Sequence, residues 1–324
     1  MTFVHDDAEF EDLLRIVAGA RRLSLGLVEK DYWVTHTLWA LHAQGFDVWF
    51  KGGTSLSKGF GLIERFSEDL DLKVEPGRVA DVPAITNWKS EGKKAIAERR
   101  NYFDRLVSTL TVPNASLSLE PVDESWRGAN IQVTYPGKHL GDLSGILRPF
   151  VLLEVGSARV TPAIPRDLTS FVHTHLEGLG LLAEFDRNLP TSVKCVHPLV
   201  TLLEKLDALH RRALNPTVEP ATFVRHIEDA ARVIAAEKDL PALTGYVDVR
   251  ALATEMLGQR QLASLPNGSD PAFTPDEGDR WNAIRRAHGA IGPMFWGARI
   301  PIEEACKAIR GWIASWYEAV SSAP

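Results

Sequence analysis

The sequence lacks most of the features that would set it apart from ordinary globular proteins. Its 324 residues include only two cysteines, Cys195 and Cys306, which are too few and too isolated for a disulfide framework or a zinc site. We expect both to be structural thiols. No apolar run approaches the ~20 residues that span a bilayer, and residues 1–7 lack a basic leader and an apolar core. We therefore expect a soluble, cytoplasmic protein without a membrane partner.

An excess of positive charge is also missing. Lysine and arginine together number 36 against 42 aspartates and glutamates, which gives a net charge of −6 and a pI near 6.0. This balance argues against indiscriminate coating of nucleic acid, but it leaves room for a local basic groove. The apolar content of 45% and charged content of 24% are ordinary, and the length suits two domains that each bury a core.

One stretch of the sequence, residues 46–74, organises the rest: FDVWFKGGTSLSKGFGLIERFSEDLDLKV. Residues 48–50 are apolar and aromatic, which predicts a buried strand that ends at Gly52-Gly53. A glycine pair can turn sharply and bring the backbone close to a ligand. Thr54 and Ser55 are good caps for a short helix, whose first N–H groups would suit a phosphate.

A second strand is predicted where polar and apolar residues alternate, from Phe66 to Leu72. Alternation sends Asp69 and Asp71 to one face, with Cα atoms roughly 6–7 Å apart. Two such carboxylates repel and raise each other's pKa unless a cation lies between them. Acidic side chains that could bind a metal, next to a turn that could bind phosphate, are typical of a nucleotidyl-transfer site.

These residues carry a resemblance. Gly52-Gly53-Thr54 followed by Asp69-x-Asp71 is similar to the signature of the polymerase-β-like nucleotidyltransferase superfamily. The fuller forms, KGGTSLS at 51–57 and RFSEDLDL at 65–72, resemble its AbiEii/MenT branch. That branch comprises the toxins of bacterial abortive-infection and toxin–antitoxin pairs. Either motif alone is weak evidence, but the two joined by one short helix form a specific pattern.

A third carboxylate is expected in the apolar run 148–155, where Glu154 is the lone acid of its strand. Burying such an acid is costly unless it is paired or bound to a cation. By resemblance, a third carboxylate belongs on a strand beside the Asp-x-Asp strand, and Glu154 is the residue that suits this place. An acid on an edge strand that faces solvent is the alternative.

Other segments are less specific. Glu29-Lys30-Asp31, in a helix predicted over 25–43, matches a recurring AbiEii feature, and either an exposed helical turn or the lining of a nucleotide pocket would explain it. The helix predicted over 88–110 is the most basic part of the chain, which suits contacts to an RNA backbone or simply a solvated face. Strands are predicted at 115–121 and 129–135, and irregular chain at 161–190.

Two later helices complete the pattern. In the first, over 197–209, Lys205 lies beside a leucine stripe; in the second, over 221–236, Arg225 and Asp229 are four residues apart. A surface ion pair worth ~0.3–0.5 kcal/mol would explain the second helix without any function. Both helices nevertheless resemble the remaining AbiEii/MenT motifs, which implies that Lys205 and Asp229 are active-site residues with Arg225 and His226 as neighbours.

The resemblance implies an α+β fold. We expect a polymerase-β-like nucleotidyltransferase domain over 1–188, with a mixed sheet flanked by helices. A mostly helical domain over 189–324 would follow and supply Lys205 and Asp229 to the active site.

A mechanism follows from the same residues. Asp69, Asp71 and Glu154 would hold Mg²⁺, because hard oxygen ligands suit this ion, while Gly52, Gly53, Thr54, Ser55 and Lys205 would bind the phosphates of an NTP. Ser67, on the metal side of the strand, is a candidate for a modified hydroxyl, and Arg65 is a candidate supporting residue.

The resemblance further implies an RNA acceptor, with the 3′ end of tRNA the leading candidate, and a cognate antitoxin that neutralises a growth-inhibiting toxin. A protein acceptor, a kinase-like toxin of the same fold and a catalytically idle partner-binding module are the alternatives.

Overall fold

The computed structural model describes residues 2–67, 69–139, 141, 148–213, 215 and 219–321, with side chains of the last helix described as far as Trp316. The chain divides into two compact units. Unit 1 comprises residues 1–59 and 66–195, and unit 2 comprises residues 60–65 and 196–324. The chain therefore enters unit 2 twice, first as a six-residue excursion.

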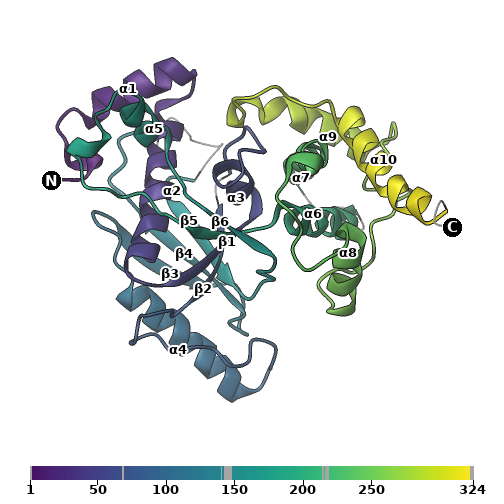
Figure 1. Cartoon of the computed structure of the whole chain (residues 1–324), viewed down its shortest axis with the longest axis horizontal. Helices are drawn as coiled ribbons and strands as arrows, with labels where there is room; N and C mark the ends of the chain where they lie inside the picture. Colours follow the sequence, from purple (N-terminus) through teal and green to yellow (C-terminus); the bar gives the residue numbers. More distant parts are fainter. Residues whose placement is uncertain are drawn as a thin grey trace. The chain divides into compact units, whose positions relative to one another are not determined.

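Unit 1 is built on a mixed sheet, which Figure 1 shows with its helices. Its strands are β1 (Asp47–Lys51), β2 (Asp69–Glu75), β3 (Ser116–Pro121), β4 (Gly128–Thr134), β5 (Val151–Gly156), β6 (Ala163–Arg166) and β7 (Val193–Val196). Its helices are α1 (Phe10–Arg21), α2 (Leu25–Ala43), α3 (Gly52–Lys58), α4 (Lys93–Thr109) and α5 (Phe171–Gly178). Short 3₁₀ turns lie at Val4–Asp6 and Leu182–Glu184.

The order of the strands across the sheet is β3-β4-β5-β2-β1-β7-β6. β2 is antiparallel to β1 and parallel to β5, while β5 is antiparallel to β4. α2 packs against β1 and β5, and α4 packs against β3. The expected mixed sheet flanked by helices is thus confirmed, and β2 and β5 lie side by side at its centre.

Unit 2 is helical in its described part. Its helices are α6 (Pro198–Ala213), α7 (Pro220–Ala235), α8 (Val249–Gly258), α9 (Asp279–Ala290) and α10 (Ile302–Ser321), with 3₁₀ turns at Glu237–Asp239 and Gly292–Met294. α7 contacts α6, α9 and α10, so it forms the centre of the bundle (Figure 1). Residues 60–65 join this unit through a bridge between Arg65 and Phe295. The expectation of a mostly helical second part is confirmed.

Both cysteines are free and buried, as expected of structural thiols. Burial raises the pKa of the Cys195 thiol to about 11 and that of Cys306 to about 12, so neither is a reactive thiolate at neutral pH. Within the described ranges, no helix is both long and apolar enough to cross a membrane.

The irregular chain expected at 161–190 is wrong, because this segment contains β6 and α5. β6 adds a strand next to β7 at one edge of the sheet. α5 begins after Ser170, whose hydroxyl accepts a hydrogen bond from the backbone N–H of His173 and so caps the helix. Both elements are too short to produce a clear periodicity of apolar residues, and the prolines around them favour an irregular interpretation.

The interpretation of Glu29-Lys30-Asp31 as an exposed helical turn is also wrong. The three residues are 2%, 0% and 4% exposed, although they are consecutive charged residues on α2. Glu29 accepts hydrogen bonds from the backbone N–H groups of Lys138 and His139, and Lys30 donates to the carbonyl of Arg148 at 2.7 Å. α2 is therefore buried all round and binds segments that lie more than a hundred residues away in the sequence.

The interior beside α2 also holds a cluster of five polar residues, which we call the histidine cluster: His5, Tyr32, His36, His173 and Asn188. Its hydrogen bonds match a neutral form of each ring. The Asn188 amide donates to the Tyr32 hydroxyl and to Nδ1 of His36, and its oxygen accepts from Nε2 of His173. Tyr32 is then left to donate to Nδ1 of His5. The three imidazoles are consequently neutral.

The histidine cluster makes the stability of the fold depend on pH. Burial lowers the pKa of His36 to about 3 and that of His173 to about 4, and it also lowers the pKa of His5. The unfolded chain takes up these protons near pH 6.5, so between that pH and the folded pKa values the unfolded state binds more protons. The stabilising contribution is complete above pH 6.5 and is lost as the pH falls.

We predict that the free energy of unfolding, measured by urea titration between pH 7.5 and 4.5, falls below pH 6.5. The limiting slope is about 1.4 kcal/mol per pH unit for each histidine. His36→Gln removes one of the titrating groups and should reduce this slope in the pH 4.5–6 range. Equal slopes in the wild type and this variant would contradict the assignment of His36 as a neutral, buried group.

Candidate functional site

The turn between β1 and α3 brings the backbone against a carboxylate. Gly52 has a φ of +72°, a conformation that side chains disfavour, and a Cβ atom there would lie 1.7 Å from Oδ2 of Asp71. Only glycine can therefore occupy this position. The amino end of α3 consequently lies directly beside the carboxylate of Asp71, as the close approach expected for Gly52-Gly53 requires.

Three carboxylates meet on the neighbouring strands β2 and β5. Asp69 and Asp71 alternate with the buried Leu70 and Leu72, so both aspartates point to the same face of β2. β5 runs parallel to β2 with Glu154 directly opposite Asp71. β5 is an interior strand between β2 and β4, so Glu154 is not at the edge of the sheet.

Electrostatic repulsion among the three acids is visible in the properties of Glu154. Although the side chain as a whole is exposed, partial burial of its carboxyl group and the negative charges of Asp69 and Asp71 raise the pKa of Glu154 to about 7. The carboxyl groups of Glu154 and Asp71 are close enough to share a hydrogen bond. A proton thus relieves part of the repulsion near neutral pH.

The guanidinium group of Arg148 relieves another part of the repulsion among the three carboxylates. Nη1 of Arg148 lies 2.6 Å from Oδ1 of Asp69, and the carbonyl oxygen of Arg148 accepts the hydrogen bond from the buried Lys30. Lys30 of α2 therefore fixes the backbone from which this arginine extends. The sequence analysis did not identify Arg148 as a site residue, because nothing in the sequence pairs it with an aspartate 79 positions away.

This donor set fits a hard divalent cation. Asp69, Asp71 and Glu154 offer carboxylate oxygens, the ligands that suit Mg²⁺, and the structure already neutralises them with a proton and a guanidinium. Among the described residues, no three His, Cys, Asp or Glu side chains converge as a finished metal centre. Binding an ion would therefore require the Arg148 guanidinium to move off Asp69 and the proton to leave Glu154.

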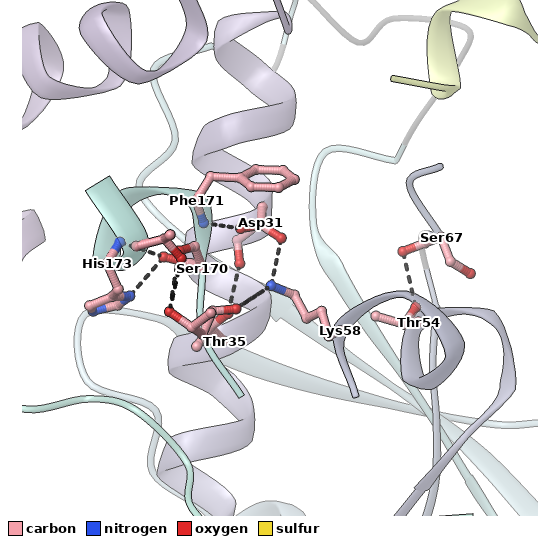
Figure 2. A network of polar contacts seen from close by, with 10 residues as sticks. Asp31, Thr35, Thr54, Lys58, Ser67, Ser170, Phe171 and His173 are labelled. Carbon is pink, nitrogen blue, oxygen red and sulfur yellow. Dashed lines mark hydrogen bonds and ion pairs between the residues drawn. The ribbon is translucent and has the colours of Figure 1, made fainter. Parts of the chain in front are cut away.

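Helix α3 is fixed at both ends, as Figure 2 shows. At its beginning, the Thr54 hydroxyl donates to the carbonyl oxygens of Asp69, at 2.7 Å, and Ser67, at 3.2 Å. At its end, the ammonium of Lys58 lies 2.5 Å from the carboxylate of Asp31 and 2.9 Å from the Thr35 hydroxyl. The helix that carries the glycine turn is thereby held in a fixed position relative to β2 and α2.

Asp31 extends this network to a third helix, because its carboxylate also accepts the backbone N–H of Phe171 at the start of α5 (Figure 2). Lys58 and Asp31 are both buried, with side-chain exposures of 8% and 5%. The sequence analysis did not identify Lys58 at all. Its signal, a lysine at the end of a helix, is too common to indicate a buried ion pair.

The remaining predicted residues of unit 1 are placed as follows. The Ser55 side chain is buried, and its hydroxyl lies against the thiol of Cys195 on β7. Ser67 is half-buried just before β2. On the basic helix α4, Arg99 is fully buried and donates to the carbonyls of Asn87 and Ser125, so it does not contribute to a surface for RNA.

A second charged cluster lies within unit 2, around Asp229 of α7. Arg65 binds the Asp229 carboxylate through two hydrogen bonds, at 2.8 and 2.6 Å, and the Lys205 ammonium of α6 lies 2.8 Å from the same group. Asp229 is 1% exposed. Burial alone would raise its pKa, but the adjacent charges of Arg65 and Lys205 hold the pKa well below the ordinary value. Asp229 is therefore ionised.

Positive charge exceeds negative charge in this cluster. Nε2 of His226 accepts a hydrogen bond from Nη1 of Arg212 at 2.7 Å. Burial and the nearby cations Lys205 and Arg212 lower the pKa of His226 well below its ordinary value, so the ring is neutral. Arg225 lies near enough to help lower the pKa of Arg212. One carboxylate thus faces several cations, an arrangement suited to an anionic ligand.

We predict that the effects of substituting Lys58 and Asp31 on the free energy of unfolding are strongly coupled, because the two residues form a buried ion pair. Lys58→Met leaves a buried carboxylate without its cation and should lower the free energy of unfolding by about 3–5 kcal/mol. Adding Asp31→Asn, which keeps an acceptor for the Phe171 N–H, should restore most of the loss. Urea titration of both single variants and the double variant measures this coupling, and additive losses would contradict it.

The cluster in unit 2 gives a parallel prediction. Asp229→Asn keeps the shape of the side chain but removes the carboxylate that both Arg65 and Lys205 contact, and we expect a loss of about 3–5 kcal/mol in unfolding free energy. The exposed Asp104→Asn on α4 is the matched control and should change it by less than about 0.5 kcal/mol. A loss as small as the control's would show that Asp229 does not neutralise the two cations.

Comparison with known proteins agrees with these features. The family described as nucleotidyl transferase AbiEii toxin, type IV toxin–antitoxin system, matches residues 38–299. Among solved structures, the chain is similar to MenT4, a nucleotidyltransferase toxin from Mycobacterium tuberculosis, with 14% identity and a TM-score of 0.37 over 93% of this chain and 98% of that one. No curated protein matches the sequence. Because the family match covers most of the chain, including both charged clusters, the protein belongs to the AbiEii family of nucleotidyltransferase toxins.

Proposed function

We propose that the protein is a Mg²⁺-dependent toxin that transfers a nucleoside monophosphate from an NTP to the 3′-terminal hydroxyl of an RNA, with tRNA as the preferred acceptor. Membership of the family supports nucleotidyl transfer and an antitoxin partner. The observation that carries the proposal is the cluster of Asp69, Asp71 and Glu154 beside the turn at Gly52.

In this proposal the three carboxylates hold the metal. Mg²⁺ would lower the pKa of the acceptor hydroxyl and stabilise the leaving pyrophosphate. Asp69 and Asp71 anchor one face of the site, and Glu154 orients the acceptor hydroxyl and accepts its proton. Arg148, once released from Asp69, provides a cation for an oxygen of the transferring phosphate.

The β- and γ-phosphates of the NTP are assigned to the backbone N–H groups at Gly52, Gly53, Thr54 and Ser55, with Lys205 as a point charge. The helical domain, 189–324, would thus supply Lys205 and Asp229 to the active site. The sequence supports this assignment, because Arg65, which binds Asp229, precedes Asp69 by four positions.

Asp229 and Arg65 are positioning residues in this scheme. The Asp229 carboxylate contacts both the Lys205 ammonium and the Arg65 guanidinium, so it holds the two cations together. His226 and Arg225 support the same cluster through Arg212. Ser67 is retained as a hydroxyl that a nucleotide or a phosphate could modify, because its carbonyl is fixed to Thr54 beside the carboxylates.

The proposed biological role is inhibition of growth until a cognate antitoxin neutralises the toxin. The substrates that we assign, NTP and tRNA, are found in the cytoplasm, which is where we place the protein.

The experiment incubates purified protein with NTP, Mg²⁺, tRNA and total cell protein, using NTP labelled at either the α- or the γ-phosphorus. We expect tRNA to take up the α-label alone. Asp71→Asn should reduce the rate by more than about a hundredfold, since even changes outside the metal's own ligands cost 10–100-fold. Asp104→Asn, an exposed aspartate on α4, should match the wild type.

The other outcomes separate the alternatives. Transfer of α-label to protein would favour a protein acceptor, and transfer of γ-label would favour a kinase-like toxin. No transfer at all, together with unchanged growth inhibition by Asp71→Asn on expression, would favour a partner-binding module without catalysis. Each of these results would contradict the proposed transfer to RNA.

A further inference from the structure

Unit 1 contains a cavity that extends beyond the proposed metal and phosphate sites. Its volume is about 370 Å³, and it begins at Asp71 and Glu154 and extends over β4 and the end of β5. This volume is within the range of small-ligand pockets, which starts near ~300 Å³. Lys51, Asn130, Arg127 and Ser157 supply its other polar side chains.

The polar residues of this cavity form a row across the sheet. Lys51 of β1 is paired with Asp71 of β2, Asp71 with Glu154 of β5, and Glu154 with Asn130 of β4. Because cross-strand partners in register point to the same face, the four side chains line one face at intervals of about 5 Å. The row therefore continues from the proposed reaction centre to Asn130.

Arg127, which directly precedes β4, supplies a cation beyond Asn130. Its Nη2 donates to the carbonyl oxygen of Lys89, at 2.9 Å, and to the Glu91 carboxylate, at 2.8 Å, so the guanidinium is held in place. Its Nε is buried and has no acceptor in the described part of the chain. The guanidinium therefore retains a hydrogen-bond donor that its present partners do not use.

The floor of the cavity near Arg127 consists of small residues from two adjacent strand ends, Gly128-Ala129 and Gly156-Ser157-Ala158. Apart from Val122, which lies beside Gly128, the described lining here is small, so a flat group can lie against the backbone between Asn130 and Arg127. A base is such a group, and an arginine plane can stack on it.

The order of the strands in the sheet indicates whether this cavity suits the NTP or the acceptor. The strands run β4-β5-β2-β1, so the carboxylates of β5 and β2 lie between the cavity over β4 and the turn that ends β1. In phosphoryl-group transfer the attacking and leaving oxygens lie roughly in line on opposite sides of phosphorus. With the pyrophosphate at the Gly52 turn, the attacking hydroxyl belongs on the β4 side.

We propose that this cavity is the acceptor subsite and holds the 3′-terminal nucleotide of an RNA. The terminal hydroxyl lies at Glu154, Asn130 hydrogen-bonds the nucleoside, and Arg127 binds the phosphate on its 5′ side. The inference rests on the proposed function and extends it to the substrate class of the acceptor. A seryl or threonyl acceptor has no phosphate for Arg127, and that favours RNA over protein.

The reaction at this subsite is balanced. The acceptor oxygen forms a bond to the α-phosphorus of the NTP while the bond from that phosphorus to the oxygen bridging the β-phosphate breaks. Pyrophosphate leaves with the electron pair of the broken bond. The proton of the acceptor hydroxyl passes to the carboxylate of Glu154 and from there to solvent.

The test uses the full-length protein and measures KM separately for the NTP and for two small acceptors. One acceptor is a single nucleoside, and the other is the same nucleoside with a 5′-monophosphate. We expect Arg127→Gln to raise the KM of the phosphorylated acceptor about tenfold, the effect of losing one charge-assisted hydrogen bond. The KM of the plain nucleoside and that of the NTP should change by less than about twofold.

Asn130→Ala is the second variant and should raise the KM of both acceptors while leaving the KM of the NTP unchanged. Arg286→Gln, an exposed arginine on α9, is the matched control for loss of one charge and should leave all three KM values unchanged. Binding of a fluorescent oligonucleotide without NTP provides a readout independent of turnover. Compared with the wild type, this binding should be weaker in both cavity variants and unchanged in the control.

Failure of this inference differs from failure of the proposed function. If the wild type transfers NMP to RNA but the cavity variants retain wild-type acceptor KM values, the subsite is wrong. A rise in the KM of the NTP instead would assign the cavity to the nucleotide substrate and would also overturn the inference. A wild type that labels no RNA would overturn the proposed function itself.

Discussion

Asp69, Asp71 and Glu154 carry like charges on adjacent strands, and the pleat and register of β2 and β5 prevent them from separating. In water such groups would turn away from one another, but here the strands that carry them are fixed by an apolar core on the other face. The structure relieves the repulsion through the guanidinium of Arg148 and through a proton on Glu154. Both are weaker counter-charges than a divalent ion, so the site favours binding one.

Unit 2 contains a cluster in which positive charge, not negative charge, is in excess. Arg65, Lys205 and Arg212 gather around one ionised carboxylate, Asp229, and a histidine that their charges keep neutral. An acidic protein thus contains a local cluster of positive charge. The two clusters thus have opposite preferences, one for a cation and the other for an anion. Neither preference is visible in the net charge of the chain.

The features that the sequence analysis predicted are local in origin. The β1–α3–β2 unit is specified by residues within about thirty positions, so alternation at Asp69–Leu72 and the glycine turn at Gly52 were sufficient to place the carboxylates on one face. Glu154 was found because an acid in an apolar strand is unusual. The predicted helices of α6 and α7 also have a clear apolar stripe, which is why their existence could be predicted.

The features that were missed depend on partners far away in the sequence. Nothing near Glu29-Lys30-Asp31 indicates burial, because the groups that satisfy these charges come from Lys138, Arg148 and Phe171. Arg148 and Lys58 were missed for the same reason, and a basic helix pattern cannot show that Arg99 turns inward. Charged side chains have no periodicity that separates a buried ion pair from a solvated one, so only tertiary structure distinguishes them.

The three buried charges of α2 also constrain the order in which the chain can fold. One partner of Asp31 is the nearby Lys58, but another, the N–H of Phe171, is 140 positions downstream, so no shorter product can complete this network. During synthesis on the ribosome, a nascent chain that has not reached α5 therefore lacks one of the hydrogen bonds that hold the buried charges of α2.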